Sequence, residues 1–142
     1  MLLGALDAVH GRTDVVSVVF MDTHTLAVAY VERLEARDWD GVTALLAEDV
    51  VYEMPQTRER IIGRAKFMRF NVEYPSDWHL AIRRVVAEGM HAAIWLDVRD
   101  DGLPVDAIVW LDTEDDRITR VTDYWPERAE PMPGREHLTT RF

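Results

Sequence analysis

The feature that most constrains the fold is a series of four long segments in the second half of the chain. In each segment apolar and polar residues alternate, and the connections between segments are short and rich in glycine or acidic residues. The segments are Trp78–Ala87, His91–Arg99, Val105–Thr113 and Arg117–Trp125. This pattern is typical of antiparallel hairpins and predicts a meander, whose apolar face needs a second layer of structure to cover it.

The first half of the chain supplies that layer as helices. Capping residues, apolar residues at helical spacing and a closing proline predict three of them, with one strand and a polar loop between the second and the third. The first helix follows the capping pair Asp22-Thr23 and ends at Glu35, the second runs from Trp39 to Ala47, and the third runs from Arg64 to Tyr74. The strand is Val50–Pro55 and the loop is Gln56–Arg60. The sequence therefore predicts an α+β fold with the helices packed on one face of the sheet.

Composition limits the classes of function. The chain has 142 residues, 48% of them hydrophobic, which suits one domain with a sizeable core. A formal net charge of −10 without a basic stripe argues against a nucleic-acid or membrane partner, and the lack of cysteine excludes disulfides and thiol chemistry. No apolar run reaches the roughly 18 to 20 residues that a membrane span needs. We expect a cytoplasmic protein.

The two ends of the chain differ in composition from the middle. Residues 1–21 lack the basic start of a signal peptide and are predicted to be an N-terminal extension, in which Val15–Phe20 forms either an edge strand or disordered chain. Residues 22–126 form the predicted domain. Residues 127–142, with Pro131 and Pro133, are predicted to be an extended C-terminal tail.

Alternation also assigns the two faces of the sheet. On the segment His91–Arg99 the apolar set faces the helices, and it comprises Ala92, Ile94, Leu96 and Val98. The opposite face then exposes the large apolar side chains Trp95, Ile108, Trp110 and Tyr124. Because this is much apolar surface to leave in water, we expect a homodimer that forms through the outer face of the sheet.

The last predicted strand carries a carboxylate on its apolar face. Val121, Asp123 and Trp125 share that face, so Asp123 must find a partner or shift its pKa where the face is buried. We interpret the face as a pocket wall. Tyr30, on the apolar face of the first helix, also brings a hydroxyl that needs a partner.

Several stretches resemble the nuclear transport factor 2-like superfamily. Val28–Pro55, which reads VAYVERLEARDWDGVTALLAEDVVYEMP, is similar to the first part of a ketosteroid isomerase, and Arg117–Trp125 resembles the closing strand of that family. The resemblance covers most of residues 22–126 and points to the SnoaL-like polyketide cyclase and ketosteroid isomerase-like branch. It implies a cone-shaped, curved, mostly antiparallel sheet with the three helices on its concave face.

The resemblance also implies roles for single residues. Tyr30 falls at the position of the isomerases' oxyanion-stabilising tyrosine. Met54 and Val109, however, replace their two functional aspartates, so authentic ketosteroid isomerase activity is not expected. SnoaL-like cyclases use an acid/base aspartate in the cavity, for which Asp123 is the candidate. The polyketide-cyclase-like description therefore fits better.

Two catalytic residues and nine pocket residues follow. Asp123 is the predicted acid/base and Tyr30 the predicted hydrogen-bond donor; the structural alternative ties Asp123 to Tyr30, Asn71 or an arginine. The predicted substrate-binding residues are Met54, Phe67, Phe70, Asn71, Ile94, Leu96, Val109, Val121 and Trp125. Arg58 or Arg60 could steer an anionic ligand, or form salt bridges within the loop. No metal or nucleotide motif occurs, so we predict neither a metal nor a cofactor.

Three functions remain open at this point. The first is a cofactor-free enzyme that performs acid/base chemistry, such as cyclisation, isomerisation, dehydration or hydrolysis, on a small apolar or polyketide-like molecule. The second is a non-catalytic module that binds a lipophilic ligand. The third is a dimeric protein-interaction domain. An open apolar cavity with an unpaired Asp123 favours the first, a fully hydrogen-bonded Asp123 the second, and a filled cone the third.

Overall fold

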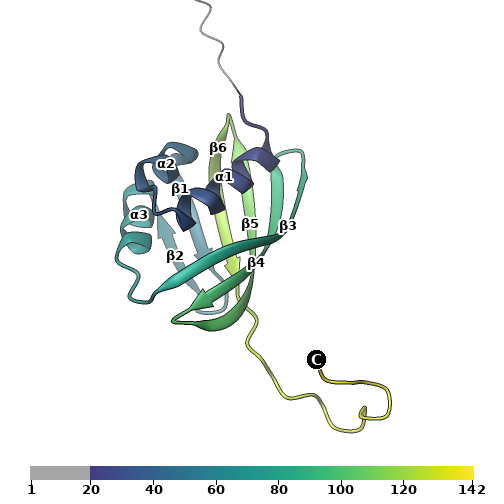
Figure 1. The fold of residues 1–142 in the computed structure, drawn as a ribbon. Helices are drawn as coiled ribbons and strands as arrows, with labels where there is room; N and C mark the ends of the chain where they lie inside the picture. Colours follow the sequence, from purple (N-terminus) through teal and green to yellow (C-terminus); the bar gives the residue numbers. More distant parts are fainter. Residues whose placement is uncertain (1–19) are drawn as a thin grey trace, which may run out of the picture.

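The computed structural model describes residues 20–142. The helices are α1 (Thr23–Glu35), α2 (Trp39–Leu45) and α3 (Arg64–Val72), and the strands are β1 (Leu46–Met54), β2 (Glu59–Ile62), β3 (Trp78–Glu88), β4 (His91–Asp100), β5 (Leu103–Glu114) and β6 (Arg117–Tyr124). The segment Val15–Phe20, apart from Phe20, lies outside the described residues. Residues 125–142 form neither helix nor strand, and Figure 1 shows this tail leaving the domain below the sheet.

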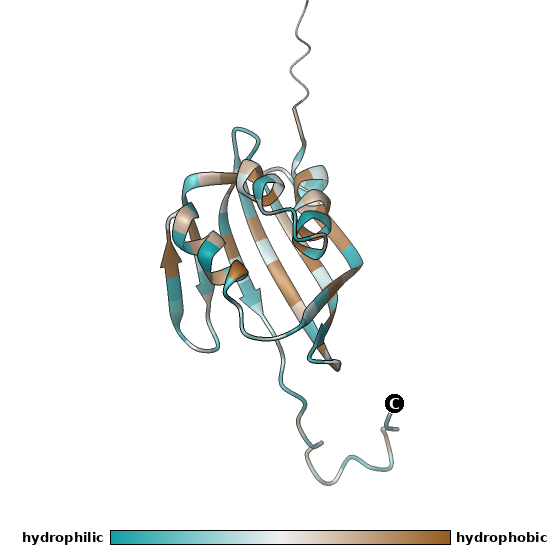
Figure 2. Cartoon of the chain, turned by 60° about the vertical axis from the view of Figure 1, so that its left-hand side comes forward, coloured by the Kyte–Doolittle hydropathy of each residue, from teal (hydrophilic) through white to brown (hydrophobic). Residues whose placement is uncertain are grey.

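All six strands form one sheet in the order β2-β1-β6-β5-β4-β3. Neighbouring strands are antiparallel except β1 and β6, which run parallel. The predicted meander is confirmed as β3 to β6, and so is the α+β class. Figures 1 and 2 show a strongly curved sheet with the helices on its concave side.

Strand β2 is not among the predicted elements: the predicted loop takes its first two residues, Glu59 and Arg60, and Ile61 and Ile62 belong to no predicted element. It pairs with β1 in a register that places Arg60 opposite Glu53, and the two side chains form an ion pair at 3.0 Å. A short strand held by a cross-strand charge pair has little of the apolar alternation by which strands are recognised. The interpretation of Gln56–Arg60 as a loop was therefore wrong at its last two residues.

The helix starts follow from side-chain caps. Asp22 accepts a hydrogen bond from the backbone N–H of Thr25 at 2.8 Å, and Asp38 accepts one from that of Gly41 at 3.0 Å. Helix α2 ends at Leu45, before the predicted end, because Leu46 is already extended and begins β1.

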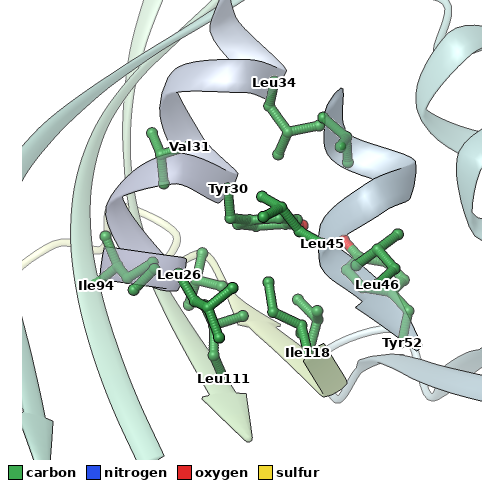
Figure 3. Packing of buried hydrophobic residues seen from close by; sticks show 14 of the residues in the cluster. Leu26, Tyr30, Val31, Leu34, Leu45, Leu46, Tyr52, Ile94, Leu111 and Ile118 are labelled. Atoms are coloured by element: carbon green, nitrogen blue, oxygen red, sulfur yellow. The ribbon is translucent and has the colours of Figure 1, made fainter. Parts of the chain in front are cut away.

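The core lies between α1 and the sheet. Figure 3 shows Leu26 of α1 close to Ile94, Leu111 and Ile118 of the strands below it. These four side chains are fully buried. Hydrogen bonds from Thr23 to the carbonyl oxygen of Gly89 and to the hydroxyl of Thr113, both 2.8 Å, fix the start of α1 at the β3–β4 turn.

The predicted faces of the sheet are confirmed. Ile94 is completely buried, whereas Trp95 points outward with 39% of its surface exposed. Trp110 and Tyr124 are also exposed, and Ile108 is half-buried. The outer face therefore presents apolar surface, and the homodimer stays a prediction. No helix of residues 20–142 has the length and apolar character that crossing a membrane requires.

Candidate functional site

A cavity of about 430 Å³ opens between the helices and the concave face of the sheet. Its walls come from the second half of α1, from β1 and α3, and from the inward faces of β3 to β6. The lining residues are Tyr30, Val31, Leu34, Tyr52, Met54, Thr57, Glu59, Phe70, Asn71, Tyr74, Trp78, Leu80, Leu96, Val98, Asp100, Val105, Ala107, Val109, Asp123 and Trp125. Most of this surface is apolar, which is the usual character of a small-molecule site.

A second hollow, of about 530 Å³, lies among charged side chains of β3, β4, β5 and the tail. Two of its charges already neutralise each other, since Arg83 and Asp97 form an ion pair at 2.5 Å. The lining of this hollow is less apolar than that of the concave cavity, and it contains none of the buried, unpaired side-chain atoms of the described residues. The concave cavity is therefore the better candidate site.

Asp123 reaches the cavity from β6. Its backbone pairs with Val109 of β5, while β1 runs parallel on the other side and places Tyr52 next to Val121. Side chains two residues apart on a strand share a face, so Tyr52 and Asp123 point to the same side. The Tyr52 hydroxyl donates a hydrogen bond to Oδ2 of Asp123. The other oxygen, Oδ1, is buried and has no hydrogen-bond partner among the described residues.

Burial controls the protonation of this group. Removal from water raises the pKa of Asp123 to about 6, although the hydrogen bond from Tyr52 acts in the opposite direction. Burial and the nearby Asp123 carboxylate raise the pKa of Tyr52 and Tyr30 above the ordinary tyrosine value. The two tyrosines therefore keep their protons near neutral pH and can act as hydrogen-bond donors.

Helix α3 holds Tyr52 in place. The ring of Tyr52 packs against Phe67 and Phe70, with ring centroids 4.7 Å and 5.5 Å away, and Phe70 in turn packs against Tyr74 at 5.5 Å. Phe67 is fully buried. Because two aromatic rings pack against it and Tyr74 supports one of them, the Tyr52 hydroxyl has little freedom to leave Asp123.

The structure brings most of the predicted site residues together around the cavity. Asp123 lies there with Tyr30, Met54, Phe70, Asn71, Leu96, Val109 and Trp125. The other three predicted pocket residues, Phe67, Ile94 and Val121, do not line it. They are at most 1% exposed and belong to the packed core, because the inward face of a strand includes core positions as well as cavity positions.

The partner of Asp123 differs from the candidates that the sequence suggested. Asn71 instead donates its side-chain N–H to the carbonyl oxygen of Phe67 at 2.8 Å. Tyr52, the actual donor, was not predicted as a site residue. The signal was present, since Tyr52 precedes the inward-facing Met54 by two residues and must share its face.

Neither loop arginine lines the cavity. Arg60 forms a salt bridge, but with Glu53 of β1 and not with a residue of the loop as the alternative had it. Within residues 20–142 no three histidine or acidic side chains gather as they would around a metal ion.

Comparisons with known proteins agree with this architecture. Residues 27–121 match the SnoaL-like domain family. A Kribbella flavida DSM 17836 protein, provisionally named a ketosteroid isomerase, is 48% identical over 84% of this chain and 89% of its own, with a TM-score of 0.83. A provisionally named polyketide cyclase of Pseudomonas putida KT2440 is 26% identical over 75% of this chain and 92% of its own, with a TM-score of 0.62.

More distant structures share the fold alone. An LEH-like epoxide hydrolase of M. tuberculosis is 24% identical over 73% of this chain and 82% of its own, with a TM-score of 0.65. Structures described as NTF2-like also match. The search of curated proteins finds no match. The family match and the 48% identical structure together place the chain in the SnoaL-like domain family, with the nuclear transport factor 2-like fold.

Proposed function

We propose that the protein is an enzyme in which Asp123 transfers a proton to or from a small apolar or polyketide-like substrate. One observation carries this proposal: the carboxyl group lies in an apolar cavity with Oδ2 held by Tyr52 and Oδ1 unpaired. A pKa of about 6 suits general acid/base catalysis near neutral pH, because both protonation states are accessible.

The two oxygens of Asp123 would divide the work. Oδ1 accepts a proton from a C–H or O–H group of the substrate, and the resulting carboxylic acid returns it to another atom. During this transfer the Tyr52 hydroxyl keeps its hydrogen bond to Oδ2 and so fixes the orientation of the base. General acid/base catalysis by a positioned side chain contributes roughly 10²- to 10⁴-fold to the reaction rate.

Tyr30 would stabilise the charge that develops on the substrate. It lines the same cavity from α1, and Figure 3 shows its ring reaching across the core toward the segment with Leu45, Leu46 and Tyr52. As a neutral hydroxyl it can donate a hydrogen bond to an oxygen that becomes negative. This arrangement suits cyclisation, isomerisation, dehydration or hydrolysis.

The open cavity supports this proposal over the alternatives. A protein-interaction domain has no need of an unfilled interior, and a purely structural carboxylate would have partners for both oxygens. A module that only binds a lipophilic ligand remains the second candidate, since the apolar lining fits it too. It differs in one measurable respect: it gives no proton transfer.

A probe that needs no knowledge of the natural substrate can test the proposal. Nitrobenzisoxazole opens when a base removes its C–H proton: the N–O bond breaks and a coloured cyanophenolate forms. We expect the wild-type protein to accelerate this reaction and Asp123→Asn to lose about 100-fold or more of the rate. Asp106→Asn, which removes the same charge from an exposed site outside the cavity, is the matched control. If the Asp123→Asn rate stays within threefold of the wild-type rate, Asp123 is not a general base.

A further inference from the structure

The charges that line the cavity all have one sign. Three lining residues carry carboxyl groups, namely Glu59, Asp100 and Asp123, and within the described chain no lysine, arginine or histidine lines the cavity beside them. Aromatic residues make up much of the remaining wall. They are Tyr30, Tyr52, Phe70, Tyr74, Trp78 and Trp125.

Asp100 is an unpaired carboxylate at the end of β4. Its Oδ1 is buried and has no hydrogen-bond partner among residues 20–142, as is true of Oδ1 in Asp123. The adjacent Asp101, by contrast, accepts a hydrogen bond from the backbone N–H of Asp77 at 2.9 Å and so helps to join the start of β3 to the β4–β5 turn. Oδ1 of Asp100 accepts no comparable hydrogen bond, so this oxygen has no evident structural role. A buried carboxylate oxygen without a partner is costly, which points to a partner that is not part of the chain.

Tyr74 lines the cavity together with Asp100 and Asp123, each of which has one unpaired oxygen. The charges of both Asp100 and Asp123, together with partial burial, raise the pKa of its hydroxyl. Its ring therefore stays neutral and offers a π face beside two negative groups. Carboxylates next to aromatic faces form the kind of environment that attracts organic cations.

Three arginines around the cavity have partners other than its carboxylates. The guanidinium of Arg37 lies 3.5 Å from the ring centroid of Trp78 and donates to the backbone oxygens of Trp78 and Leu34. One face of Trp78 is thus already occupied, which leaves the other aromatic residues for a ligand. Arg60 is paired with Glu53 at 3.0 Å, and Arg64 donates to the backbone oxygen of Leu46 at 3.2 Å.

We propose that the cavity selects a ligand with an ammonium group on an apolar body. The ammonium lies between Asp100 and the ring of Tyr74, and the apolar body extends along Leu96 and Val109 toward Asp123. The formal net charge of −10 adds a long-range attraction for such a cation. This inference rests on the proposed function, because it assigns the substrate class of the same site.

Three ligands of one shape separate charge from apolar contact. Phenylpropylammonium, phenylpropanol and phenylpropionate share the phenyl ring and the three-carbon chain and differ in the charge of the end group. We expect the ammonium compound to bind about tenfold more tightly than the alcohol, and the carboxylate to bind most weakly, in calorimetric titrations of the full chain at low salt. Equal affinity for the ammonium compound and the alcohol would overturn the proposal, and this comparison needs no variant.

Two variants locate the cation. Asp100→Asn should lose most of the preference for ammonium over alcohol while it keeps its affinity for the alcohol. Asp106→Asn, an exposed site outside the cavity, should keep the wild-type preference despite the same loss of one negative charge. A wild-type preference in Asp100→Asn would place the cation elsewhere and overturn the assignment. Circular dichroism of each variant verifies that it is folded.

The binding assay and the proton-transfer assay fail independently. If the ammonium preference is missing but Asp123→Asn abolishes proton transfer, the proposed ligand class is wrong and the acid/base role of Asp123 is supported. If the preference is present but Asp123→Asn keeps the wild-type rate, the proposed ligand class is supported and Asp123 is not a general base. Circular dichroism of Asp123→Asn must match that of the wild type, so that a lost rate reflects the missing base and not a folding defect.

Discussion

Replacement of Tyr52 by phenylalanine isolates one hydrogen bond in the site. The variant loses the hydroxyl that donates to Oδ2 of Asp123. It keeps the ring that packs against Phe67 and Phe70 at 4.7 Å and 5.5 Å, so the wall of the cavity stays in place. The perturbation therefore acts on the electrostatics of Asp123 and leaves the shape of the pocket unchanged.

The expected magnitude follows from the charge on the acceptor. A hydrogen bond to a charged group is worth about 1.5–3 kcal/mol, and about 1.4 kcal/mol corresponds to one pKa unit. Because the bond from Tyr52 lowers the pKa of Asp123, its loss should raise that pKa from about 6 by roughly one to two units. At pH 7 the ionised fraction would then fall from about nine-tenths to between roughly a half and a tenth.

The pH dependence of the nitrobenzisoxazole reaction measures this shift. The base form of Asp123 is the active one, so the rate rises with pH through the pKa, and the Tyr52→Phe profile should move to higher pH with a similar plateau. Tyr124→Phe removes a hydroxyl from the exposed neighbour of Asp123 and should leave the profile where it is. A midpoint that stays the same or moves to lower pH in Tyr52→Phe would refute the reasoning.

Three further predictions concern stability and assembly. The folded-state pKa of Asp123 is raised from 3.8 to about 6, so the wild type loses stability as pH rises through this window. In urea titrations Asp123→Asn should therefore gain about 2.5 kcal/mol relative to the wild type between pH 4 and pH 8, and parallel pH curves would contradict this. The hydrogen bond to Glu35 raises the pKa of His79, so its contribution is present below the unfolded value of about 6.5 and is lost above the folded one. Thermal melts should show a deficit of His79→Asn at pH 6 that disappears by about pH 9. For the predicted homodimer, light scattering should find Trp110→Glu monomeric and the wild type dimeric; a monomeric wild type would rule the dimer out.

Much of the fold could be predicted because the relevant signals are local. The strands β3 to β6 each carry an apolar face with period two, and their connections are too short for anything except hairpins. The helix starts depend on single capping residues such as Asp22 and Asp38. Strand β2 lacked these signals, because Arg60 and Glu53 stabilise its pairing by charge.

The site was harder to predict because it depends on contacts between distant segments. The face of Asp123 follows from the alternation of its own strand, and its burial follows from that face. Its partner Tyr52 is 71 residues away in the sequence and reaches it only because β1 inserts parallel to β6. No local pattern specifies which strand lies next to β6, so the choice of Tyr52 over Tyr30 or Asn71 required the structure.

The position of the cavity follows from how the two halves of α1 meet the sheet. Leu26, in the first half, packs against Ile94 and fills the interior at the end where Thr23 contacts Gly89. In the second half, Tyr30 and its neighbours line open space. Inward residues of one strand are about 6.6 Å apart along it, so a single step from Ile94 to Leu96 on β4 passes from packed core to cavity wall. Alternation gives the inward face of each strand, but only the placement of the helix decides which of those residues serve stability and which can touch a ligand.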